Sequence, residues 1–245
     1  MSLQVLDRID EDYVLDPNLV FYLPNKEFGL SAVDGKYYCM SSDHYGHLIE
    51  NNGSTWQLNS RRFDGDDWWN IDKVLPALAS TKQGTWMCWV KLDDASIAAT
   101  YLRLIAFGDT DVLEEICIYV EATGKLYAQV YKAGANQWAL DTNAIAFSDG
   151  VYAHVALIQD GVSPVILVNG VKIAQTFQGS TDKTAWFSVC TGLDNGRFGC
   201  SNRNGGGNAN FIANGNLAKP KIFSRAMSIG EVQQCHYLPE KEIYR

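Results

Sequence analysis

Short runs of alternating apolar and polar residues, separated by turns, recur along the chain. They are TWMCWVKL (85–92), EICIYVE (115–121), KLYAQVYK (125–132), YAHVALIQ (152–159) and PVILVNGVKIAQTF (164–177). Such runs are typical of β-strands, and Asn169-Gly170 favours a type I′ hairpin turn because both residues tolerate positive φ. Asp160-Gly161 and Thr123-Gly124 mark further turns. Since no helical periodicity lies between the runs, they predict an antiparallel two-sheet sandwich.

One segment near the C-terminus has the signals of a short helix. Ser228 and Glu231 have the spacing of a capping box, in which each side chain accepts a hydrogen bond from the other residue's backbone amide. Pro239 is expected to end this helix. No stretch resembles an interdomain linker, so we predict one domain over residues 15–240, preceded by an N-terminal arm over residues 1–14.

The charge and hydropathy of the chain exclude several partners. Its 245 residues carry a net charge of −8, and no basic stripe is present to neutralise phosphates, so we expect no nucleic-acid partner. No stretch approaches the ~20 apolar residues of a membrane span, so we expect no membrane insertion. The N-terminal segment MSLQVLDRIDEDYVLD lacks the basic and apolar regions of a signal peptide.

The six cysteines form no C-x-x-C pair, which argues against a zinc site. Cys88 and Cys117 lie within apolar runs and are predicted to be buried free thiols. Cys190 and Cys200 flank a predicted turn, where a disulfide is the alternative to two free thiols. Unpaired cysteines fit folding in a reducing compartment.

Several motifs follow one another in a fixed order along the chain. They are LVFYLP (19–24), SSDHYGH (41–47), FDGDDWW (63–69), GTWMCWVKL (84–92), LIAFGD (104–109), YAHVALIQDGVSPVILVNGVKI (152–173) and NGNLAKPKIFSRAMSIGEVQQ (214–234). Together they resemble the laminin-G-like, concanavalin A-like lectin and glucanase family over roughly residues 15 to 238. The resemblance implies an all-β fold, an antiparallel two-sheet jelly-roll sandwich with one short C-terminal helix. Tyr152 departs from the family's usual tryptophan, and Ala218 and Lys219 depart from its usual acidic position.

Residues 63–72, FDGDDWWNID, have the composition of a metal site, a sugar platform, or a turn that leads into a core strand. The resemblance makes the segment mainly a turn and a strand, with Asp66 and Asp67 exposed to solvent. Because successive side chains of a strand point to opposite faces, one of Trp68 and Trp69 must face away from the core. That ring is a candidate platform for a sugar.

The predicted carbohydrate-binding residues combine aromatic rings, which stack on sugar C–H groups, with amides that hydrogen bond to hydroxyls. Most of the tryptophans are expected in the core, and Trp138, which follows a Gly-Ala-Asn stretch, is predicted to lie in a loop. Residues 201–216, SNRNGGGNANFIANGN, are predicted to form a long loop. The predicted set is Trp68, Trp69, Trp138, Asn204 and Asn208.

The resemblance also implies a calcium site in the loop that follows LIAFGD. Asp109 and Asp111 stand there, and backbone carbonyls near Ile212 and Asn214 would complete the ligand set if the chain follows the family. Hard oxygen ligands of this kind suit calcium. The alternative is an acidic loop that is simply solvated.

Catalysis is not expected. Glucanases of this fold place Glu, Asp and Glu at alternate positions of one strand, whereas the corresponding residues here are Glu115, Cys117, Tyr119 and Glu121. Glu115 and Glu121 are about 20 Å apart along a strand. A glycosidase pair needs roughly 5 to 9.5 Å between its carboxyl groups, so this strand does not supply both of them.

Three functions follow, the first of which is preferred. It is a non-catalytic, lectin-like carbohydrate-binding module on a virion or other extracellular assembly, where it attaches to surface glycans. The second is a structural capsid-decoration or head-fibre protein that contacts capsid or tail proteins and is free to form homo-oligomers. The third is a glucanase-like enzyme that cleaves glycans.

A looser resemblance concerns where such a module would act. SSDHYGHLIENNGSTWQLNSRRFDGDD (41–67) also resembles lectin-like proteins of tailed bacteriophages. A virion protein that leaves the cell by lysis needs no signal peptide, and a domain from a longer secreted protein would explain its absence equally well.

Overall fold

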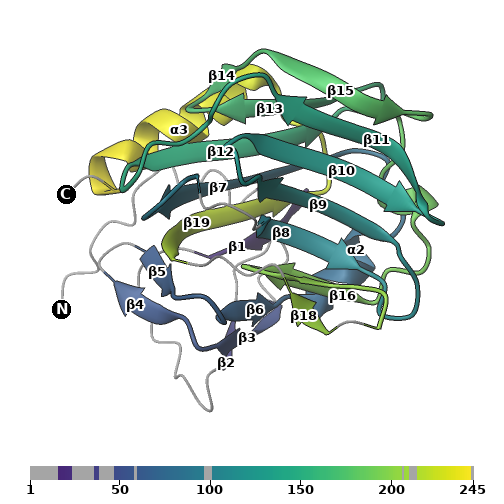
Figure 1. Cartoon of the computed structure of the whole chain (residues 1–245), viewed down its shortest axis with the longest axis horizontal. Helices are drawn as coiled ribbons and strands as arrows, with labels where there is room; N and C mark the ends of the chain where they lie inside the picture. Colours follow the sequence, from purple (N-terminus) through teal and green to yellow (C-terminus); the bar gives the residue numbers. More distant parts are fainter. Residues whose placement is uncertain are drawn as a thin grey trace.

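The computed structural model describes residues 16–23, 36–38, 47–57, 60–96, 101–205, 207–209 and 214–243. Two large antiparallel sheets face each other in these residues (Figure 1). The predicted all-β, two-sheet sandwich of jelly-roll type is confirmed. The N-terminal arm predicted over residues 1–14 lies outside the described residues.

The eight-stranded sheet has the order β14 (Val171–Lys172), β13 (Pro164–Val168), β12 (Tyr152–Gln159), β7 (Gly84–Leu92), β19 (Gly215–Phe223), β5 (Ser60–Phe63) and β4 (Thr55–Gln57), and β1 (Leu19–Tyr22) also pairs with β19. The nine-stranded sheet has the order β15 (Gln175–Ser180), β11 (Ala135–Thr142), β10 (Leu126–Lys132), β9 (Glu115–Val120), β8 (Leu102–Gly108), β16 (Asn195–Phe198), β6 (Trp68–Asn70), β3 (Leu48–Asn52) and β2 (Lys36–Tyr38). A small ribbon contains β17 (Ser201–Asn202) and β18 (Asn208–Ala209). The helices are the 3₁₀ turns η1 (Asp72–Val74) and η2 (Phe187–Val189) and the α-helices α2 (Leu75–Leu78) and α3 (Ile229–Ile243).

The core lies between the inner faces of the two sheets and is rich in aromatic rings. Trp86 of β7 packs against Phe107 of β8 across the sandwich, with ring centroids 5.4 Å apart, and against Trp186 at 4.9 Å. Burial of each such side chain contributes about 1.5–3 kcal/mol, which is the main reason the sheets stay together. Trp89 points to the opposite face of β7, as the odd spacing between the two tryptophans predicts.

The hairpin turns explain both a correct and a wrong prediction. Asn169 (φ 51°) and Gly170 (φ 73°) form the predicted turn between β13 and β14. Ala133 (φ 50°) and Gly134 (φ 82°) form a similar turn, and β11 begins immediately after it. Trp138 is therefore not in a loop. It is a fully buried residue of β11, paired with Val130, and the prediction that it is an exposed sugar platform was wrong.

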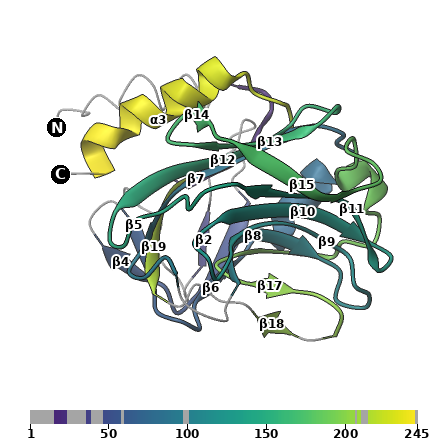
Figure 2. The same cartoon turned by 45° about the horizontal axis from the view of Figure 1, so that its top comes forward.

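The helix α3 lies across the outer face of the eight-stranded sheet, over β12 and β14 (Figure 2). The capping box is confirmed, since the Ser228 amide donates to Glu231 at 2.7 Å and the Glu231 amide donates to the Ser228 hydroxyl at 3.3 Å. Pro239 does not end the helix, which continues to Ile243. None of the described helices is long and apolar enough to cross a membrane.

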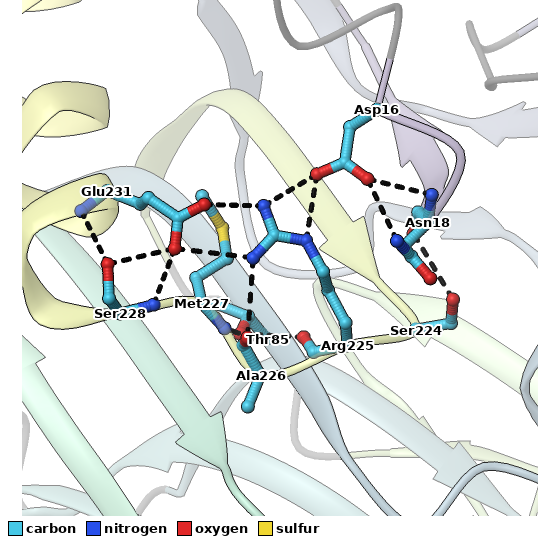
Figure 3. Close-up of polar contacts among 9 residues, drawn as sticks. All are labelled: Asp16, Asn18, Thr85, Ser224, Arg225, Ala226, Met227, Ser228 and Glu231. Carbon is cyan, nitrogen blue, oxygen red and sulfur yellow. Dashed lines mark hydrogen bonds and ion pairs between the residues drawn. The ribbon is translucent and has the colours of Figure 1, made fainter.

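Arg225 fastens this helix to the start of the chain's first described strand (Figure 3). Its guanidinium donates to Asp16 at 2.6 and 2.9 Å and to Glu231 at 2.6 Å. The hydrogen bond from Arg225 lowers the pKa of Glu231 to about 2. One arginine therefore joins residues 16 and 231, which are distant in the sequence.

The cysteines of the described residues are free and buried: Cys88, Cys117, Cys190, Cys200 and Cys235. The prediction of buried free thiols at Cys88 and Cys117 is confirmed. Cys190 and Cys200 form no disulfide, and the turn predicted between them is wrong, because Asn195 and Gly196 begin β16.

Candidate functional site

The outer face of the nine-stranded sheet carries no helix in the described part of the chain (Figures 1 and 2). Strand register places four of its side chains in one row. Arg103 of β8 pairs with Tyr119 of β9, Tyr119 pairs with Tyr127 of β10, and Tyr127 pairs with Asp141 of β11. The residues between them in each strand fill the core, so this row faces outward.

A cavity of about 440 Å³ opens on this face. Its lining comes from β8, β9, β10, the segments on either side of β8 and the loop after β17, and consists of Tyr101, Arg103, Leu113, Tyr119, Gln129, Tyr131 and Arg203. Aromatic walls with a few polar groups that converge on the interior are typical of small-ligand sites.

The floor of the cavity is an ion cluster centred on Glu115. Arg103 donates to this carboxylate from Nε at 3.2 Å and from Nη2 at 3.3 Å, and Gln129 donates from Nε2 at 3.1 Å. Arg203, in the loop after β17, approaches the same carboxylate at 3.0 Å. Two guanidinium groups against one carboxylate leave a net charge of +1 in this cluster.

The two arginines control the ionisation of Glu115, and one of their N–H groups has no hydrogen-bond partner among the described residues. Burial would raise the pKa of this carboxyl group, but the charges of Arg103 and Arg203 outweigh burial and hold the pKa below its usual value. Nη1 of Arg103 has no hydrogen-bond partner among the described residues, although the side chain is buried. A buried donor without a partner lowers the stability of the folded protein.

Tyrosine rings form the walls above this floor. Arg103 lies over the ring of Tyr119 at 4.0 Å, and Tyr119 stacks on Tyr127 with ring centroids 4.9 Å apart and an interplanar angle of 28°. Tyr101, which is 51% exposed, meets Tyr119 edge-on at 5.5 Å. These rings present apolar faces beside cationic and polar groups.

The tryptophans of the FDGDDWW segment lie on opposite faces of β6, as predicted. Trp69 is buried against Phe63 and Phe198, at centroid distances of 5.3 and 5.6 Å. Trp68 faces outward, half-buried, with the guanidinium of Arg197 at 4.8 Å from its ring centroid. Trp69 therefore cannot stack on a sugar, and Trp68 lies outside the lining of the cavity.

The two predicted asparagines do not line the cavity. Asn204 is exposed with a left-handed backbone (φ 54°), and its amide donates to the carbonyl of Asp109 at 2.9 Å. The side-chain oxygen of Asn208 accepts from Nε of Arg197 at 3.2 Å. Arg203, which the sequence reasoning missed, is the residue of this loop that reaches the cavity.

Asp109 and Asn214, two of the residues predicted to hold calcium, are not brought together. The Asp109 carboxylate accepts from the amides of Asp111 and Val112, so it caps its own turn. The side-chain oxygen of Asn214 accepts a hydrogen bond from Arg62 near the C-terminal end of β7. Asp109 lies near the other end of β7, where Trp86 contacts Phe107, and the two ends are roughly 20 Å apart along the strand. Ile212 lies outside the described residues.

A different acidic group lies in the FDGDDWW turn. The carboxylates of Asp64, Asp66 and Asp67 lie within 4.8 Å of one another, the type of oxygen set that calcium uses. Asp67 was predicted to be solvated, but it is buried because its carboxylate folds back against Gly53 and accepts from the Asp64 amide at 2.9 Å. Burial raises the pKa of Asp67 to about 6, with a further contribution from the neighbouring Asp64 and Asp66 carboxylates.

Solved structures similar to this chain include a sialidase module and whole sialidases. The CBM40 module of the Ruminococcus gnavus IT-sialidase, bound to alpha2,3 sialyllactose, is 19% identical, with a TM-score of 0.61 over 75% of this chain and 100% of that one. A leech intramolecular trans-sialidase is 22% identical, with a TM-score of 0.61 over 74% of this chain and 27% of that one. A Trypanosoma rangeli sialidase is 13% identical, with a TM-score of 0.65 over 92% and 34%.

These similarities show the fold, and the chain spans about a third or less of each of these two sialidases. No curated protein matches the sequence. The family model of the concanavalin A-like lectin/glucanases superfamily, Laminin_G_3, matches residues 63–233, which is more than half of the chain. The protein belongs to the concanavalin A-like lectin/glucanase superfamily.

Proposed function

We propose that the protein is a non-catalytic carbohydrate-binding module that takes an acidic sugar in the cavity between Arg103 and Arg203. The observation that carries this proposal is a local surplus of positive charge under tyrosine walls, in a chain whose net charge is −8. The overall charge repels anions, so a cationic cavity points to one specific anionic ligand.

The chemistry of the lining fits a sugar carboxylate. Guanidinium groups bind carboxylates through charge-assisted hydrogen bonds, which are about twice as strong as neutral ones. Arg203 has 26% of its side chain exposed and is free to turn from Glu115 toward a ligand. The rings of Tyr101 and Tyr131 stand beside it for contact with sugar C–H groups. The Ruminococcus gnavus module, whose structure contains sialyllactose, supports an acidic sugar as the ligand class.

Binding without catalysis is proposed because Glu115 is committed to two arginines and a glutamine. Its neighbour on the same strand face, Glu121, is about 20 Å away. This spacing exceeds the separation of a glycosidase pair. Incubation with sialyllactose should therefore release no sugar, and release of sialic acid or lactose would overturn this part of the proposal.

The test compares 3′-sialyllactose with lactose, which lacks the acidic sugar, by isothermal titration calorimetry. We expect binding of 3′-sialyllactose alone, weakened about tenfold or more by Arg203→Gln because one charge-assisted contact is worth roughly 1.5–3 kcal/mol. Galacturonic acid, as a second acidic sugar, tests whether the carboxylate is sufficient for binding.

The matched control is Arg62→Gln, which removes an ion-paired surface arginine from the other sheet. It should leave affinity unchanged. Equal binding of lactose and 3′-sialyllactose, equal losses in both variants, or failure to bind any of these sugars would contradict an acidic-sugar site.

Three earlier expectations remain predictions. Calcium is one of them, and repeating the titration with a chelator tests it, since loss of affinity or stability would indicate a bound ion. Attachment to glycans from a virion or other extracellular assembly is the second. A purely structural role among capsid or tail proteins is the third, and it predicts no affinity for any glycan.

A further inference from the structure

We infer that the row Arg103–Tyr119–Tyr127–Asp141 on the outer face of the nine-stranded sheet is positively charged at one end and negatively charged at the other. We infer further that this charge distribution selects glycans in which one acidic sugar is followed by a neutral one. The inference rests on the proposed function, because it assumes that the acidic sugar sits at the arginine end. It adds a second subsite beyond the cavity and the residues that determine what this subsite accepts.

The geometry of the row follows from strand pairing. Its four residues are direct cross-strand neighbours on four successive strands. Strands lie about 4.8 Å apart, so the row is about 14 Å long from Arg103 to Asp141. That length exceeds a single sugar ring, and the stacked pair Tyr119–Tyr127 provides a continuous aromatic surface across the middle of the row.

The far end of the row has the opposite charge to the cavity. Asp141 lies at this end together with Glu121 of the β9–β10 hairpin. Glu121 is two residues after Tyr119 and therefore faces outward, as Tyr119 does. Lys125 approaches Asp141 at 4.0 Å. Two carboxylates against one ammonium group leave a net charge of −1, whereas the Glu115 cluster carries +1.

The acidic end also has unused acceptor capacity. Asp141 accepts from the exposed side chain of Gln178 at 2.8 Å, and Glu121 is half-buried beside Thr123 at 3.5 Å. A carboxylate has about four acceptor positions, so the half-buried Glu121 can still accept hydrogen bonds from sugar hydroxyls, whereas Asp141 is buried and contributes its negative charge. Burial and the neighbouring Asp141 charge both raise the pKa of Glu121, in keeping with two carboxylates at one end of the row.

These charges lead to a rule for the second sugar. A neutral sugar over Tyr127 can donate a hydroxyl hydrogen bond to Glu121 while its C–H groups contact the ring. A second acidic residue would bring a carboxylate next to two others, and like charges at an interface are unfavourable. The face therefore favours a singly charged glycan over a polyanionic chain.

The test compares 3′-sialyllactose, which has one carboxylate, with α2,8-linked disialic acid, which has two, by calorimetric titration. The unmodified protein should bind 3′-sialyllactose more tightly. Glu121→Gln and Asp141→Asn should each raise the affinity for disialic acid about fivefold, because a repulsion on the order of 1 kcal/mol is removed. Binding of 3′-sialyllactose should change by about twofold or less, since the amide oxygens still accept.

The control is Asp160→Asn, at an exposed turn between β12 and β13, where an Asn oxygen can still cap the turn. Asp160→Asn should leave the affinities for 3′-sialyllactose and for disialic acid unchanged. Equal wild-type affinity for the two ligands, no gain in the variants, or parallel losses for both ligands would overturn the charge rule and leave the proposed function standing. Failure of the unmodified protein to bind either ligand would overturn the proposed function and this inference with it.

Discussion

The outer faces of both sheets carry aromatic side chains beside polar groups, but these side chains have different roles on the two faces. On the eight-stranded sheet, Trp89 stacks against His236 of α3 at 5.1 Å and meets His154 in a tilted arrangement at 5.3 Å, and all three side chains are buried. On the nine-stranded sheet, Tyr119 and Tyr127 stack at a similar distance, but no described helix covers them. A polar aromatic row becomes a second core where a helix covers it, and a candidate binding surface where it is left open.

The largest expected difference between the faces is in stability. Trp89→Ala should lower the free energy of unfolding by about 3–5 kcal/mol, because it leaves a cavity under α3. Tyr127→Ala should lower it by about 1 kcal/mol or less, since that ring is only half-buried. Urea denaturation of both variants measures the difference. Similar losses would show that the tyrosine row also serves mainly as a core.

The attachment of the covering helix can be broken separately. Arg225→Ala removes charge-assisted hydrogen bonds to Asp16 and Glu231 and should cost about 1.5–3 kcal/mol of stability. Arg62→Ala, which removes the more exposed pair with Asp93, should cost about 0.2–1 kcal/mol. Thermal unfolding compares the two. An equal effect would mean that the Arg225 contacts are no more than an ordinary surface ion pair.

The smallest expected effect is the pH dependence of stability that arises from His154, on the face covered by α3. Burial, with contributions from His236 and Lys221, lowers the pKa of His154 to about 3, whereas an unfolded histidine titrates near 6.5. Between these values the unfolded state binds more protons, so stability is complete above pH 6.5 and falls as the pH decreases toward 3.

Between pH 6.5 and 5.5 the contribution of His154 should fall by on the order of 1 kcal/mol, and it is partly offset by Asp67, whose pKa of about 6 makes its own contribution grow as the pH falls. Denaturant titrations at the two pH values measure it, and His154→Phe should flatten the dependence. An unchanged dependence in this variant would assign the effect to other groups.

Much of the fold could be predicted because its signals are local. Alternation located β7, β9, β10 and β12, and Asn169-Gly170 located a hairpin. Trp138 was misplaced because Ala133-Gly134 was not recognised as a turn, although Trp138, Leu140 and Thr142 alternate like a strand. Pro239 was expected to stop α3 on local grounds, yet the helix continues through it.

The candidate site was largely missed because its residues are far apart in the sequence. Arg103, Glu115 and Arg203 come together only through the pairing of β8 with β9 and the loop after β17. One signal was present: KLYAQVYK places Tyr127, Gln129 and Tyr131 on an outward face. Of the residues predicted to hold calcium, Asp109 and Asn214 lie far apart, because Asp109 follows β8 near the Trp86 end of β7 whereas Asn214 precedes β19 near Leu92.

The position of β19 has a consequence for how the molecule assembles. This strand, synthesised after all the other described strands, lies between β7 and β5 near the middle of its sheet, and it also pairs with β1. Contacts between distant parts of a chain must pay a large loop-closure entropy before they contribute stability, and they slow folding. A chain still emerging from the ribosome therefore holds an unfinished sheet with an open centre, and the sandwich can close only after residue 223 has been made.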